Sequence, residues 1–122
     1  MLKFAFVLFL GALGATVSLG VFADGVQITG DALLAVVSGK KFTGTSTRGN
    51  PWEATYTEDG KLHVRLLNKS WSDYGTWDLK GDRVCSERSK RTYMCYEVMR
   101  VSDDEYLWVD DRGQSTKSSG PK

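Results

Sequence analysis

The stretch YGTWDLKGDRVCSERSKRTYMCYEV, residues 74–98, decides the fold that we predict for this chain of 122 residues. From Tyr74 to Lys80 the residues alternate between two faces, which is the period of a β-strand. Gly81-Asp82 forms a two-residue turn that places Leu79 opposite Val84. The stretch therefore predicts three consecutive antiparallel strands.

The two cysteines of the chain, Cys85 and Cys95, lie on the second and third of these strands. If they face each other, Val84 faces Tyr96 and belongs to the core in both hairpins, so the two registers agree. Two cysteines in a small domain that carries an export signal favour a structural disulfide over a metal or redox pair. We predict a Cys85–Cys95 disulfide on the outer face of the sheet.

The strand pattern extends in both directions from this stretch. A short amphipathic helix is expected from Asp31, as its cap, to just before Gly39. Further strands are expected at 41–46, 52–57, 61–67 and 105–109, beside those at 74–80, 83–87 and 92–99, and a short last strand after Gly113 is an open alternative. We therefore predict a mainly all-β fold: a small antiparallel up-and-down β-barrel, or a strongly curved meander, of about eight strands after one short N-terminal helix. The domain should span residues 24–113, and residues 114–122 should form a flexible polar tail.

The hairpin from Trp52 to Leu67 can be placed in register from its turn. A three-residue loop with Gly60 as a left-handed bulge brings the apolar residues of both strands to one face. A two-residue loop would mix apolar residues with His63 and Arg65. The bulge also sets Glu53 opposite Arg65 on the solvent face.

The N-terminal segment has the pattern of a signal peptide. Lys3 precedes an apolar run from Phe4 to Val21, and Val21-Phe22-Ala23 offers a cleavage site before Asp24. The run of about 18 residues is also long enough to stay as a membrane anchor, which is the alternative. Residues 1–23 are thus expected to direct export to the periplasm or the extracellular space.

Charge and residue content argue against several classes of function. Loss of Lys3 with the signal leaves equal numbers of acidic and basic residues, so nucleic acid is not an expected partner. His63 is the only histidine, and neither a metal set nor a nucleophile–base pair can be assembled around it from sequence. We expect no enzyme activity, no metal and no cofactor.

The chain also resembles a family of small exported proteobacterial proteins that carry a domain of unknown function with lipocalin-like or calycin-like β architecture. The resemblance covers roughly Asp31 to Gly113. It rests on Gly39-Lys40-Lys41-Phe42-Thr43-Gly44, on Tyr56 with Asp59-Gly60, on Gly75-Thr76-Trp77, and on the two cysteines. It implies a β domain outside the cytoplasm, and it implies no catalytic residue or ligand.

Two groups of residues are candidates for contact with a partner. Trp71 and Tyr74 flank a polar connection, where a core role is not automatic, so they either cap the barrel or anchor an interface. Arg88, Lys90 and Arg91 form a basic hairpin tip, either a solvated tip or a site for an acidic partner. These residues support an exported, non-enzymatic binding module that acts through its loops on an envelope protein.

The alternative function is a lipocalin-like carrier or sensor of a small apolar ligand. An eight-stranded barrel has room either for its own side chains or for one small ligand. The side chains expected inside are large: Trp52, Tyr56, Leu62, Val64, Leu66, Trp77, Leu79, Val84, Met94, Tyr96 and Val98, with Leu33, Leu34 and Val37 of the helix at one mouth. We therefore expect a filled interior, which favours the binding module.

Overall fold

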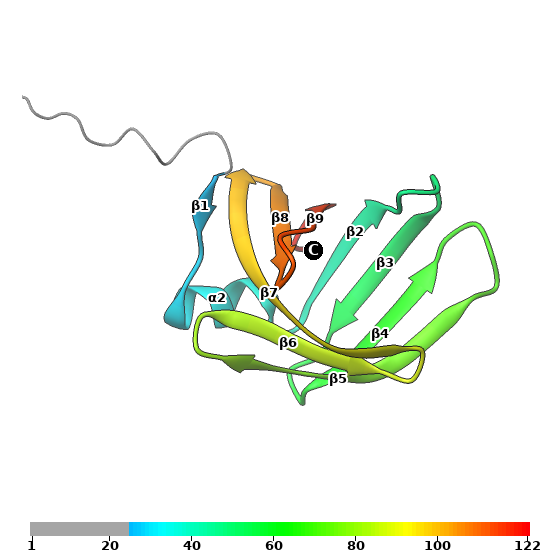
Figure 1. Cartoon of the computed structure of the whole chain (residues 1–122), viewed down its shortest axis with the longest axis horizontal. Coiled ribbons are helices and arrows are strands. Elements are labelled where there is room, and N and C mark those ends of the chain that lie inside the picture. The colour runs from blue at the N-terminus through cyan, green and yellow to red at the C-terminus, as the bar shows by residue number, and fades with distance from the viewer. Residues whose placement is uncertain (1–24) are drawn as a thin grey trace, which may run out of the picture.

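The computed structural model describes residues 25–122 and contains one sheet that closes on itself, with a short helix at one end (Figure 1). The predicted signal peptide lies outside these residues. In chain order the elements are β1 (Val26–Gln27), α2 (Gly30–Val37), β2 (Lys40–Thr45), β3 (Pro51–Tyr56), β4 (Lys61–Leu66), β5 (Ser72–Lys80), β6 (Arg83–Arg88), β7 (Arg91–Ser102), β8 (Glu105–Asp110) and β9 (Ser115–Ser119).

Eight antiparallel strands close the barrel within this part of the chain, which confirms the predicted fold class. Their order is β7-β6-β5-β4-β3-β2-β9-β8, and β8 pairs again with β7. The remaining strand, β1, lies outside the barrel and pairs with the far half of β7, where Val26 faces Arg100. Closure leaves the barrel strands without a long free edge.

The prediction of a flexible tail after residue 113 is wrong. Ser115–Ser119 form β9, which pairs with β8 on one side and with β2 on the other. Ser118 is buried and accepts a hydrogen bond from Nε1 of Trp108. This strand carries no apolar side chain, and it is held by its backbone ladders and by this one buried polar contact, so hydrophobic patterning could not reveal it.

The predicted hairpin registers are confirmed. Gly60 has φ of +87°, and the three-residue loop that it closes sets Trp52 opposite Leu66 and Glu53 opposite Arg65. Nε of Arg65 lies 2.8 Å from Oε1 of Glu53. Turn chemistry therefore fixed which face of these strands is inside, because a slip by one residue would reverse every side chain.

The helix differs from its prediction at its start and on one face. It begins at Gly30, so Asp31 lies in the first turn instead of capping it, and the N-cap residue Thr29 makes no side-chain cap bond. The carboxylate of Asp82, from the β5–β6 turn, accepts a hydrogen bond from the Gly30 amide at 3.0 Å. A distant aspartate thus does what Asp31 was expected to do.

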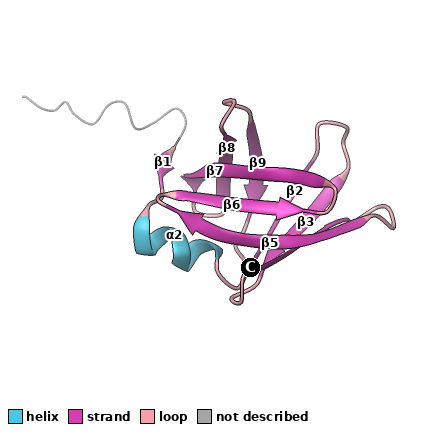
Figure 2. Cartoon of the chain, turned by 60° about the horizontal axis from the view of Figure 1, so that its bottom comes forward, coloured by secondary structure: helices cyan, strands magenta, loops and turns pink. Residues whose placement is uncertain are grey.

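Helix α2 covers one mouth of the barrel (Figure 2). Leu33 and Val37 are fully buried there, whereas Leu34 is exposed. Residues four apart share one helix face, and Leu34 lies on the next face round the axis, so its expected core position was wrong. Gly39, with φ of +75°, follows the end of the helix as predicted.

Aromatic side chains occupy the middle of the barrel. The Phe42 ring meets Tyr56, Tyr106 and Trp108 edge-on, with ring centroids 5.2–6.0 Å apart. Tyr56 stacks on Trp108 at 5.5 Å. The core includes Tyr56, Leu62, Trp77, Val84 and Val98 from the predicted inward set, and Trp52, Val64, Leu79 and Tyr96 pack against it. The prediction missed Phe42, Tyr106 and Trp108.

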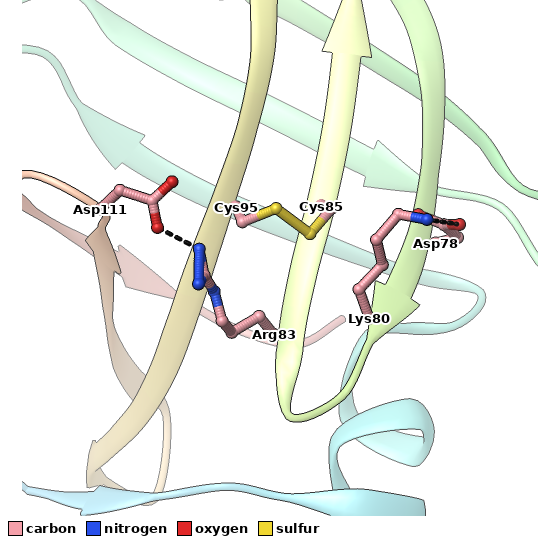
Figure 3. The surroundings of a disulfide bond; sticks show 6 residues. All are labelled: Asp78, Lys80, Arg83, Cys85, Cys95 and Asp111. Atoms are coloured by element: carbon pink, nitrogen blue, oxygen red, sulfur yellow. Dashed lines mark hydrogen bonds and ion pairs between the residues drawn. A yellow bond between two sulfur atoms is a disulfide. The ribbon is translucent and has the colours of Figure 1, made fainter.

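The Cys85–Cys95 disulfide is present and joins β6 to β7 (Figure 3). Val84 points inward, so the neighbouring Cys85 lies on the outer face as predicted. Both cysteines are nevertheless buried. Ion pairs of Arg83 with Asp111 and of Lys80 with Asp78 lie on either side of the bond in the figure.

Candidate functional site

Three connections lie at the end of the barrel opposite α2, on the right in Figure 1. They are residues 46–50, 67–71 and 89–91, and we call them together the loop end. Consecutive antiparallel strands place these connections at one end and the turns 57–60, 81–82 and 103–104 at the other, which we call the helix end. The turn 111–114 has the same parity as the three connections, but its Asp111 pairs with Arg83 beside the 81–82 turn, so we do not count it in the loop end. The loop end contains most of the residues that the sequence indicated for partner binding.

The three connections of the loop end contact one another. Between the first and second, Nδ2 of Asn68 lies 3.4 Å from Oδ1 of Asn50. Between the second and third, Nζ of Lys90 lies 5.1 Å from the centre of the Trp71 ring and donates a hydrogen bond to the backbone oxygen of Ser72 at 3.0 Å. Trp71 and Lys90, which sequence analysis treated as two groups, therefore belong to one surface.

The residue that organises this surface is Asp73, which sequence analysis missed. Its carboxylate is buried and accepts hydrogen bonds from the amide of Tyr74 at 2.9 Å, the amide of Lys90 at 3.1 Å and the hydroxyl of Ser89. Nη1 of Arg88 lies 3.5 Å from its Oδ2. One carboxylate thus fixes the hairpin tip against the start of β5.

Two opposing effects act on the pKa of Asp73. Burial alone would raise it, but hydrogen bonds from Ser89, Lys90 and Tyr74 and the charge of Arg88 outweigh burial and hold the pKa below its usual value. The carboxylate is therefore charged at neutral pH, and it neutralises Arg88 inside the protein.

Arg88 does not belong to a solvated tip, contrary to that interpretation of the hairpin. It faces Gly75 across the ladder and shares the inward face with Val84 and Ser86. Its side chain is only 14% exposed. A Cβ on Gly75 would overlap the backbone of Glu87, so the glycine lets β6 approach closely. Arg91 and Lys90 are exposed as expected.

Tyr74 lies on the outer face of β5, away from the Trp71 ring. It stacks on His63 with ring centroids 4.3 Å apart and planes 7° apart, and it is 64% exposed. His63 faces Thr55 and Tyr74 on the outer side of the sheet, as the register predicted. The structure therefore separates Tyr74 from Trp71, with which sequence analysis had grouped it.

The connecting segments at the two ends of the barrel carry opposite charges. The loop end has four exposed cations, Arg48, Lys69, Lys90 and Arg91, and none of its residues is acidic. The turns of the helix end contain only acidic charges, all exposed: Glu58, Asp59, Asp82, Asp103 and Asp104. A chain that is almost neutral overall thus presents a basic surface at one end.

Nothing in residues 25–122 brings together three His, Cys, Asp or Glu side chains as metal ligands. No helix in this range is long and apolar enough to cross a bilayer. Comparison of the chain with protein-family models, with curated proteins and with solved structures finds no significant match. We therefore choose the candidate site from the structure alone, and we take it to be the loop end.

Proposed function

We propose that this chain is an exported, non-enzymatic binding module that docks onto another envelope or extracellular protein through the loop end. The observation that carries the proposal is the set of exposed cations around Trp71, with no acidic residue in the three connections. Aromatic residues and arginine are frequent at the centres of protein interfaces, and complementary charge speeds correct association.

The loop end is also ordered before any partner arrives. Asp73 holds the hairpin tip, and Lys90 is held over Trp71, so little conformational freedom remains to be lost at these positions on binding. A preorganised surface of this kind favours recognition. The aromatic packing inside the barrel supports surface binding over the carrier alternative.

The proposal can be tested by photo-cross-linking in cells that make the protein. A photoreactive residue is placed at Lys69 in the loop end or, as the matched control, at Asp103 in the helix end. We expect one defined protein adduct from position 69 and none from position 103. Lack of any adduct from position 69, or the same adducts from both positions, would contradict docking through the loop end.

The partner identified in this way is then purified and titrated against the folded domain. Lys69→Glu and Arg91→Glu should each weaken binding at least tenfold, whereas Lys117→Glu, an exposed change on β9, should not. Export is tested separately by N-terminal sequencing: Asp24 indicates cleavage, and Met1 on a membrane-bound form indicates an anchor.

A further inference from the structure

We infer that the loop end recognises an acidic segment of its partner that carries an apolar anchor side chain. This inference rests on the proposed function and specifies the chemistry of the partner. Its basis is a difference between the two halves of the barrel.

At the helix end most inward-facing side chains are buried, although Leu79 is only partly so. Leu33 and Val37 of α2 lie over this mouth, and Val84 and Val98 beneath them are fully buried. Toward the loop end no helix of the described chain covers the mouth. Several inward-facing apolar residues there stay partly exposed: Trp52, Val64, Leu66 and Met94. The open half of the barrel thus keeps apolar surface in contact with solvent.

The connections around this mouth add more apolar surface. Leu67 is 47% exposed, and Trp71, four positions further along the chain, is partly exposed. The backbone oxygen of Trp71 accepts a hydrogen bond from the amide of Leu66, which ties the connection to the inward-facing end of β4. Inward-facing Leu66 and the rim residues Leu67 and Trp71 therefore belong to one short segment, and apolar residues of this kind occupy the central part of an interface.

Cations surround this apolar area. Arg48, Lys69, Lys90 and Arg91 each come from a connection that borders the mouth, and the charge of Arg88 is already neutralised by Asp73. A complementary ligand must bring negative charges around an apolar group. An acidic peptide segment with one aliphatic or aromatic residue has this composition, and burial of its apolar side chain adds to the attraction between the charges.

The direction of the chain favours a protein over a membrane surface as the occupant. The chain enters the domain at Gly25, which lies against the backbone of Arg100 at the helix end of β7. If the preceding apolar segment stayed in a bilayer, the loop end would lie at the opposite end of the domain from it. The loop end is then placed to reach a partner away from that membrane.

The test is a selection of random peptides of 12 residues displayed on phage against the folded full domain with its disulfide intact. We expect enrichment of peptides in which Asp and Glu flank a single apolar residue. A synthetic peptide from this set should lose at least tenfold in affinity when its apolar residue is replaced by Ser. Its binding should also weaken as salt is raised.

Matched variants of the protein show where the selected peptide binds. Lys69→Glu and Leu67→Ser should each reduce the affinity of the selected peptide at least tenfold, with unchanged thermal stability. Their controls at other positions, Lys117→Glu on β9 and Val101→Ser, which is 41% exposed at the helix end, should leave the affinity unchanged. Lys90 is not altered, because it also supports Trp71 and Ser72.

Three results would overturn the inference. One is a set of selected peptides without acidic enrichment, or binding that survives both loop-end variants. Another is stronger sedimentation with phosphatidylglycerol vesicles than with neutral ones, abolished by Lys69→Glu, which would assign the surface to lipid. The third is association of the basic loop end with the acidic helix end of a second copy, seen as a mass that rises with protein concentration.

The two proposals can fail separately. If a partner is cross-linked from position 69 but the domain does not select acidic peptides, the proposed function stands and only the inferred chemistry of the partner is refuted.

Discussion

Nε1 of Trp108 donates a hydrogen bond to the hydroxyl of Ser118 across 2.9 Å, and both residues are buried. Ser118 lies in β9, the strand that joins β8 to β2 and so closes the barrel. This single polar contact connects the least apolar strand to the aromatic core. The polar C-terminal segment is therefore part of the folded domain.

Removing residues 115–122 should destroy cooperative folding, because it opens the barrel between β2 and β8 and uncovers Phe42 and Trp108. Ser118→Ala should be milder and cost about 1–3 kcal/mol, since it leaves a buried indole N–H without its acceptor. Near-ultraviolet circular dichroism on heating measures both changes. Lys117→Ala is the control and should stay within about 0.5 kcal/mol of wild type. A truncated chain that melts like the full one would show that β9 is dispensable.

Trp77→Ala should destabilise the protein by about 3–5 kcal/mol, because it leaves a cavity in the core that the surrounding strands cannot fill. Trp77→Phe keeps an aromatic ring but loses the hydrogen bond from Nε1 to the backbone oxygen of Thr57, at 2.9 Å, so it should cost less. Urea unfolding measures both changes.

A hydrophobic fluorescent probe should bind Trp77→Ala better than wild type, because the variant gains an empty apolar cavity. Tight, saturable binding of the probe by folded wild-type protein would instead favour the carrier function.

Sequence reasoning found the hairpin registers because local turn chemistry determines them. Gly60 and Gly81-Asp82 each permit one loop length that keeps the apolar residues on one side, and neighbouring hairpins must agree on the strand that they share. This constraint needs no knowledge of the rest of the fold. It correctly paired Cys85 with Cys95 and placed Trp77 inside.

Sequence analysis overlooked Asp73 and placed Arg88 at an exposed tip, because it assumed that charged residues lie outside and did not follow the alternation of the strands. Asp73 precedes Gly75 and Trp77 by even steps, and Arg88 follows Val84 and Ser86 in the same way. Extending the alternation by one position would have placed both charges inside. The ion pair between Asp73 and Arg88 could not be predicted from the alternation alone, because it depends on β5 and β6 lying side by side.

Net charge likewise says nothing of how the charges are distributed over the fold. The acidic and basic residues nearly cancel in the sum, but the connections of the loop end contain only basic charges and the turns of the helix end only acidic ones. Grouping the connections 46–50, 67–71 and 89–91 at one end of an up-and-down fold would have shown the basic group. The basic end becomes visible only when alternating connections are grouped.

Replacing Cys85 and Cys95 by Ser should lower the free energy of unfolding by about 2–4 kcal/mol, because the bond restricts the unfolded chain. Alkylation of the native protein without reductant should label neither cysteine. Ser86→Ala, on the same strand, is the control for disturbance of β6. Complete labelling of the native protein would refute the bond.

Asp73→Asn should destabilise the loop end, because it removes the charge opposite Arg88 and weakens the acceptor for Ser89 and Lys90. The decrease in unfolding free energy should exceed that of Asp78→Asn, whose exposed pair with Lys80 contributes at most about 1 kcal/mol. Hydrogen exchange of the Lys90 amide should quicken in the first variant only. Equal effects of the two changes would mean that the buried carboxylate does not organise the tip.

The same comparison has a defined pH dependence. The pKa of Asp73 is lower in the folded protein than the ordinary aspartate value of about 3.9, so the unfolded chain takes up its proton first as the pH falls. The stability that the charged carboxylate contributes is therefore fully present above about pH 4. It is lost as the pH falls from there through the folded-state pKa. The difference in unfolding free energy between wild type and Asp73→Asn should be constant from neutral pH to about pH 5 and should shrink below about pH 4. Urea titrations at a series of pH values measure it, and a difference that stays the same down to the lowest pH at which both proteins fold would contradict a charged, buried Asp73.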